Sequence, residues 1–209
     1  SDESGINVTQ LSGTVIGGSN PTSMTNCTIS NNNEFEVQIT NTSGTLTDFQ
    51  MSGNAISSNG LPINGNVSSP HGNLVNFLAL GTANMTTNVT SGTFTGNWNP
   101  VTPPSTITAT AMQCDHSGTS GTMTANISNC TFTNNNVGPQ ASVAGGAQMI
   151  FNFSNNIVTG SRSSAINFFA DANPPFTKSL MGKVLNNTIG IVGVTNSGAM
   201  LGNGIRIQN

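Results

Sequence analysis

Charged and aromatic residues are scarce in this chain of 209 residues. It contains 4 lysines and arginines, 7 aspartates and glutamates, 2 histidines and 1 tryptophan, and it has no tyrosine. The chain has four basic residues and a net charge of −3. These values indicate no nucleic-acid partner, because nucleic-acid-binding proteins neutralise phosphates with clustered lysine and arginine. No apolar run approaches the ~20 residues of a membrane-spanning helix. We therefore expect a chain that is not membrane-embedded.

Small polar residues and glycine make up about half of the chain instead. Counting along the chain gives 32 Asn, 28 Thr, 24 Ser and 24 Gly, or 108 of 209 residues. Helix-favouring residues are few, and no apolar stripe with a 3.6-residue period persists. Short alternating clusters of apolar and polar residues recur instead, and this pattern is typical of β-strands. The composition predicts an all-β protein.

A short motif recurs along the chain and marks an internal repeat. Its clearest copies, residues 26–33 and 129–136, read Asn-Cys-Thr-apolar and then run into asparagines. Two further strand patterns lie between successive copies, so each unit holds three short strands. Such units fit a solenoid in which each unit makes one coil, since sandwich strands would recur every ~8–12 residues. The apolar anchors of the six copies, spaced by 27, 38, 38, 26 and 31 residues, are Ile29, Ile56, Phe94, Phe132, Val158 and Ile189.

The recurrent asparagine-rich turn and strand resemble those of the right-handed parallel β-helix, found in pectate-lyase-like enzymes, phage tailspikes and bacterial surface proteins. The resemblance covers about residues 5–209. It implies a solenoid of about six coils with three short strands per coil. We expect residues 1–209 to form a single β-helix domain that is a segment of a longer repeat protein. Open solenoid ends expose unpaired strands, so an isolated segment is also expected to self-associate end to end.

Alternation along the strands predicts which side chains point into the coil. If the anchors point inward, so does the second motif position, which holds asparagine or cysteine in five coils and Gly92 in the remaining one. A buried asparagine can bond its amide to the next coil and so satisfy a polar group that is costly to bury. Cysteine fits the same small site. We predict a structural inward ladder, rather than a ligand site, made of Cys27, Asn54, Cys130, Asn156 and Asn187.

The reactive side chains are dispersed. Cys27 and Cys130 lie three coils apart, which at ~14 Å is too far for a disulfide, so we expect free thiols. Residues 113–116, Gln-Cys-Asp-His, bring a thiol, a carboxylate and an imidazole together, but no further ligand follows at metal-binding spacing. We interpret them as a loop with a half-buried cysteine, and Glu34 and Glu36 as a solvated edge. The sequence predicts no catalytic residue, no metal and no cofactor.

Extra residues in the longer units predict the variable surface. Turn-rich insertions occupy residues 57–72, 97–105, 138–146 and 171–177. Insertions in repeat proteins often map to one binding face, and a loop tryptophan can stack on a sugar or contact a protein. The candidate binding residues in these insertions are Trp98, His71, Asp171 and Phe176.

Three functional hypotheses follow. The first is a non-catalytic, extracellular or cell-surface segment of the adhesin or autotransporter-passenger type, bacterial or phage in origin, that binds a host or matrix glycan or a protein surface. The adhesin label comes from the resemblance. The second is a polysaccharide-acting β-helix enzyme or tailspike-like domain, which needs two carboxyl groups within ~10 Å. The third is an ice-binding solenoid, which needs Thr-x-Thr pairs in one unbroken column, whereas pairs such as Thr93/Thr95 and Thr122/Thr124 fall in different elements of the coil.

Overall fold

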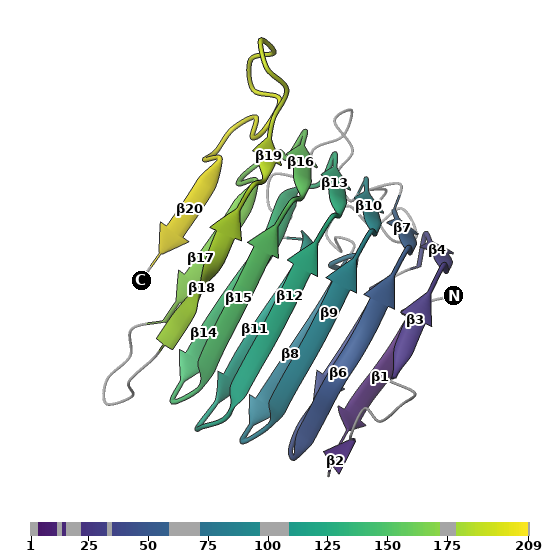
Figure 1. Ribbon diagram of the computed structural model, residues 1–209, viewed down its shortest axis with the longest axis vertical. Helices are drawn as coiled ribbons and strands as arrows, with labels where there is room; N and C mark the ends of the chain where they lie inside the picture. The colour runs from purple at the N-terminus through teal and green to yellow at the C-terminus, as the bar shows by residue number, and fades with distance from the viewer. Residues whose placement is uncertain are drawn as a thin grey trace.

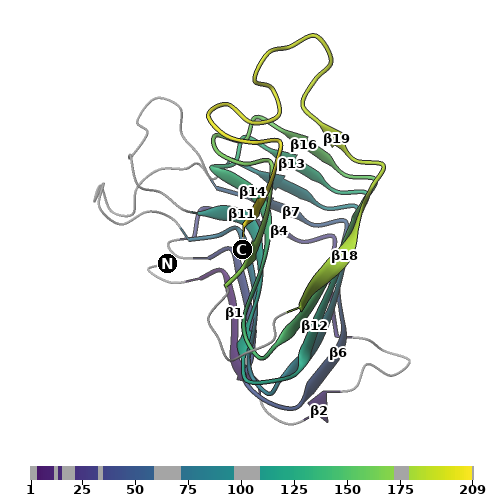
Figure 2. The same ribbon diagram turned by 90° about the vertical axis from the view of Figure 1, so that its left-hand side faces the viewer.

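The computed structural model describes residues 4–11, 14–15, 22–32, 35–58, 72–96, 109–171 and 179–208. Its strands wind through three parallel sheets as a right-handed parallel β-helix (Figure 1). Sheets A and B run down two sides and converge at a narrow edge, while sheet C spans the wide end (Figure 2). Over the described ranges there is no helix, and hence none that could cross a membrane. The predicted all-β solenoid with three strands per coil is confirmed.

Each coil passes through sheet A, then sheet B, then sheet C. Sheet A holds, in spatial order, β1 (Ile6–Leu11), β5 (Val37–Asn41), β8 (Val75–Gly81), β11 (Thr110–Gly118), β14 (Val137–Gly145), β17 (Ile166–Ala170) and β20 (Ile205–Gln208). Sheet B holds β2 (Thr14–Val15), β6 (Thr45–Ser52), β9 (Asn84–Thr90), β12 (Thr122–Ser128), β15 (Gln148–Ser154) and β18 (Ser179–Leu185), and β3 (Ser23–Thr25) also pairs with β6. Sheet C holds β4 (Thr28–Ser30), β7 (Ala55–Ser57), β10 (Thr93–Thr95), β13 (Thr131–Thr133), β16 (Ile157–Thr159) and β19 (Thr188–Ile189).

The six apolar anchors form one inward column in sheet C, as predicted. They pair residue by residue from Ile29 to Ile189. Phe94 and Phe132 are fully buried, and their stacked rings lie 4.8 Å apart, centroid to centroid. This distance matches the spacing of hydrogen-bonded strands. The core is therefore continuous from coil to coil.

Corner residues with positive φ define where each strand of sheet C begins and ends. The corner before sheet C has φ values of 54° to 64° at Asn26, Gly53, Ser91, Asn129, Asn155 and Asn186. Asparagine and glycine enter this left-handed region at low cost, which explains the first asparagine of the motif. A second positive-φ column follows sheet C at Asn31, Gly96, Asn134, Gly160 and Gly190.

Two sequence interpretations are wrong. Residues 138–146 are not an insertion, because Val137–Gly145 is β14 in the middle of sheet A. A Cβ on Gly138 would lie 1.8 Å from the carbonyl oxygen of Ala165, so this glycine permits close approach between coils instead of marking a turn. Residues 113–116 are not a loop but part of β11.

The third correction concerns Glu36. It is not on a solvated edge, since only 2% of it is exposed. Asn32 donates to its carboxylate from both the backbone N–H and the side-chain amide. Burial raises the pKa of Glu36, and the bonds from Asn32 oppose that shift. Glu34 lies outside the described residues.

Candidate functional site

The predicted inward ladder residues occupy one column, where the asparagines bond successive coils together. The amide oxygen of Asn54 accepts the backbone N–H of Cys27 at 2.8 Å, and its nitrogen donates to the Met24 carbonyl at 2.8 Å. Asn156 repeats this arrangement with Cys130 and Ile127 one coil earlier. Asn187 does so with Asn156 and Phe153. All of these bonds are internal to the solenoid, so the column is structural.

The thiols are unbridged in the described chain. Cys27, Cys114 and Cys130 are all free. Burial raises the pKa of the Cys130 thiol to about 11, and its sulfur accepts the Gly92 N–H at 3.4 Å. Burial also raises the pKa of Cys114. A thiol is nucleophilic only as the thiolate, so neither buried cysteine is suited to catalysis.

His116 points into the core together with Cys114, and both are fully buried. One imidazole nitrogen, Nε2, lies 2.9 Å from the Ala83 carbonyl oxygen, and Nδ1 has no partner. Burial lowers the pKa of His116, which keeps the ring neutral. Within the described ranges no three His, Cys, Asp or Glu side chains gather where they could hold a metal ion.

The candidate binding residues lie mostly beyond what the structure describes. Trp98, His71 and Phe176 are outside the described residues. Asp171 directly follows β17, and its backbone N–H donates to the Val143 carbonyl. Residues 59–71 connect β7 to β8, and residues 97–108 connect β10 to β11. Both connections therefore lead from sheet C into neighbouring strands of sheet A.

The outer face of sheet A carries an axial column of amide side chains, which we call the amide column. Its members pair in register across all seven strands: Asn7, Gln38, Asn76, Gln113, Gln140, Asn167 and, at the last strand, Arg206. Asn167 donates to Gln140 at 2.8 Å, and Asn73, just before β8, donates to Gln113 at 2.6 Å. This column was not predicted from the sequence, although an amide recurs at the outward position of each alternating strand.

Two members of the amide column have unused hydrogen-bonding capacity. Asn76 is only 8% exposed, and its side chain makes no hydrogen bond with the described chain. The amide oxygen of Asn167 is buried and also has no partner. Because buried polar groups normally find a partner, an external donor to the Asn167 oxygen would be stabilised.

Asp115 lies in the adjacent outward column of sheet A, beside Ser142, which donates to it at 2.8 Å. Burial raises the pKa of Asp115, while Ser142 and the neighbouring His116 oppose the shift. Asp171 lies two coils and two residues away on the same face, so the two Cα atoms are about 12 Å apart by strand spacing.

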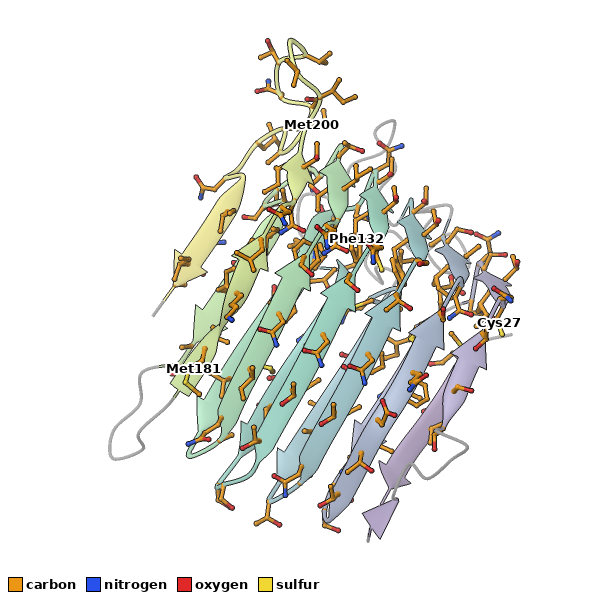
Figure 3. All side chains as sticks on the ribbon, in the orientation of Figure 1. Cys27, Phe132, Met181 and Met200 are labelled. Atoms are coloured by element: carbon orange, nitrogen blue, oxygen red, sulfur yellow. The ribbon has the colours of Figure 1, made fainter. Side chains whose placement is uncertain are left out.

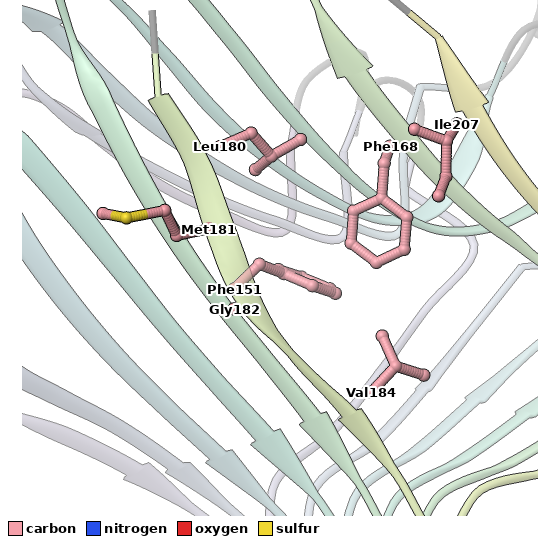
Figure 4. A pocket seen from close by; sticks show the side chains of 7 residues that line it. All are labelled: Phe151, Phe168, Leu180, Met181, Gly182, Val184 and Ile207. Atoms are coloured by element: carbon pink, nitrogen blue, oxygen red, sulfur yellow. The ribbon is translucent and has the colours of Figure 1, made fainter.

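An apolar cavity of about 240 Å³ lies between the last strands of sheets A and B (Figure 4). Aromatic and aliphatic side chains from β15, β17, β18 and β20 line it, among them Phe151, Phe168 and Ile207. It is continuous with the core cluster, to which Phe151 and Phe168 also belong. No titratable group lines it, so it offers packing surface and no chemistry.

Comparison with protein-family models, with curated proteins and with solved structures finds no match.

Proposed function

We propose that this chain is a non-catalytic, extracellular surface protein of the adhesin or autotransporter-passenger type, and that the outer face of sheet A binds a neutral glycan. The amide column carries the proposal. Each amide offers two N–H donors and a carbonyl acceptor, and sugar hydroxyls offer the complementary groups. The column runs along the solenoid axis, so it suits a linear chain of sugars.

The unpartnered amide oxygen of Asn167 strengthens this assignment. A buried acceptor without a partner costs about 1–3 kcal/mol. A sugar hydroxyl that donated to this oxygen would remove that cost.

The surroundings of the column favour a neutral ligand. No charged side chain interrupts the column between Asn7 and Asn167. The next outward column runs from Leu78 through Asp115 and Ser142 to Phe169, and its two apolar members provide area on which the C–H faces of sugars can pack.

Binding is tested by screening the whole chain on a glycan array and then comparing two double variants. Asn76→Ala with Gln113→Ala removes two neighbouring amides from the column. We expect about a tenfold loss of affinity, because two neutral hydrogen bonds contribute roughly 0.5–1.5 kcal/mol each. The control is Thr86→Ala with Thr124→Ala, on the outer face of sheet B in the same two coils. A chain that binds no glycan, or an equal loss in the control, would contradict the proposal.

The position of Asp115 favours a second candidate, a glycan-cleaving enzyme, because this carboxyl lies half-buried on the outer face of sheet A, beside the amide column, and its pKa is raised by burial as in a general acid. Incubating the array-selected glycan with wild type and Asp115→Asn separates the two. Cleavage by wild type that Asp115→Asn abolishes, with binding retained, would replace the adhesin proposal.

A further inference from the structure

Sheet C presents a second surface, distinct from the amide column, which we call the threonine face. It consists of the outward side chains on both sides of the buried anchors. The first column is Thr28, Ala55, Thr93, Thr131, Ile157 and Thr188, and the second is Ser30, Ser57, Thr95, Thr133 and Thr159. Seven of these eleven residues are threonine, two are serine and none is charged.

The register changes the sequence-based view of the Thr-x-Thr pairs. Thr93 pairs with Thr131 and Thr95 pairs with Thr133, so these two pairs stand directly side by side. The pair Thr122/Thr124 belongs to β12 in sheet B, as the spacing indicated. Sheet C therefore has ordered rows of outward threonines, which were not predicted from the sequence.

The threonine face is a rigid two-dimensional lattice. Adjacent coils are 4.8 Å apart where Phe94 stacks on Phe132 beneath the face, and residues two apart along a strand are separated by about 6.7 Å. Positive-φ corners bound the strands, and the inward asparagines bond one coil to the next. Threonine has few χ1 rotamers, so its hydroxyl and methyl are held in place.

The hydroxyls of this face are not used within the solenoid. On sheet B, where the rows of outward side chains are visible in Figure 3, Asn152 donates to Asn126, Asn126 to Asn88 and Asn88 to Asp48. On sheet A, Ser142 donates to Asp115. No hydrogen bond of this kind joins the threonine hydroxyls of sheet C in the described chain. They are therefore available to a lattice outside the protein.

We propose that the threonine face binds ice. Ice is a neutral solid whose surface oxygens repeat in two dimensions, at separations close to those of the threonine columns. Each hydroxyl can donate one hydrogen bond to that lattice and accept two from it. Each methyl group orders water in its first shell. A charged side chain would hold its own hydration shell against the lattice, and this is the one sheet whose outward residues include none: sheet A has Asp115 and sheet B has Asp48 and Lys183.

Thermal hysteresis and partition into a growing ice hemisphere measure the activity directly on the whole chain. Wild type is expected to show both. Thr93→Lys with Thr131→Lys places two bulky charges on the face and should reduce the hysteresis at least fivefold. The matched control, Thr86→Lys with Thr124→Lys, places the same charges on sheet B in the same two coils and should retain it.

Circular dichroism establishes that both variants fold. If the lysine variant fails to fold, Thr131→Val is used, because it removes the hydroxyl at nearly constant volume and should still lower the hysteresis. No hysteresis and no ice partition in wild type overturns the proposal, and so does an equal loss in the control. A third outcome is that wild type binds crystalline cellulose but not ice, and that the Thr93→Lys with Thr131→Lys variant loses the cellulose binding. This outcome would assign the threonine face to a polysaccharide crystal and would also overturn the ice-binding proposal.

Discussion

Replacing Asn156 by alanine tests whether the inward ladder stabilises the solenoid. Asn156 is 1% exposed and connects three coils. Its amide oxygen accepts the Cys130 N–H at 2.8 Å, and its nitrogen donates to the Ile127 carbonyl at 3.1 Å and to Asn187 at 3.1 Å. Alanine removes all of these side-chain bonds.

The size of the effect follows from what is left unpaired. Cys130 and Ile127 are each 1% exposed, so water does not reach the N–H and the carbonyl that lose their partner. A buried unsatisfied group costs about 1–3 kcal/mol, and two such groups give about 2–6 kcal/mol. We expect the free energy of unfolding to fall by roughly 3 kcal/mol.

Urea denaturation followed by circular dichroism measures this difference, provided that a second probe gives the same transition. The control is Asn152→Ala, in the preceding strand β15 and pointing outward, where the side chain makes one partly exposed bond to Asn126. Water replaces that bond, so the change should stay within ~0.5 kcal/mol. A loss below ~1 kcal/mol for Asn156→Ala, or equal losses for both variants, would refute the structural role of the ladder.

Three further predictions concern the core, the thiols and the pH dependence. Phe132→Ala should cost ~3–5 kcal/mol, because the ring is fully buried and stacked on Phe94; a change below ~1 kcal/mol in the same urea assay would place Phe132 outside the core. Thiol titration of the denatured, unreduced protein should find three free sulfhydryls, and finding one would mean that a disulfide exists. Because burial raises the pKa of Asp115 in the folded state above the usual value of 3.8, its favourable contribution is complete below that value and is lost as the pH rises through the raised pKa. Asp115→Asn should therefore gain stability over wild type at neutral pH, and urea midpoints that show no gain at pH 7 relative to pH 3 would contradict this reasoning.

Local chemistry explains why sheet C was predictable. The positive φ at Asn129 and the inward site at Cys130 each restrict the residue type. The motif therefore predicts both the position of the corner and which residues of the following strand point inward. The anchors Phe94 and Phe132 then follow from alternation. No long-range information is needed.

Sheet A was harder to predict because its strands are held by pairing with neighbouring coils, and their local sequence alone does not indicate a strand. β14 contains Gly138 and Pro139, which indicate a turn in isolation, yet the strand is held by β11 on one side and β17 on the other. The polar run from Gln113 to His116 resembles a loop, although Cys114 and His116 alternate inward with outward Gln113 and Asp115. The amide column needs the pairing of all seven strands and is invisible in any one of them.

The corners of sheet C also separate the length of a coil from its alignment. Phe94 and Phe132 are 38 residues apart and Phe132 and Val158 are 26 apart, yet both pairs stand directly opposite each other. The alignment of the anchors in sheet C is therefore independent of the number of residues in each coil. A change of length in the connection from sheet C to sheet A does not shift the register of the next coil. Foreign peptides could replace the chain between Ser58 and Gly72 and between Gly96 and Ala109. These two connections lead into β8 and β11, which are neighbouring strands of sheet A. The solenoid would then present two peptides whose attachment points are about one strand spacing apart.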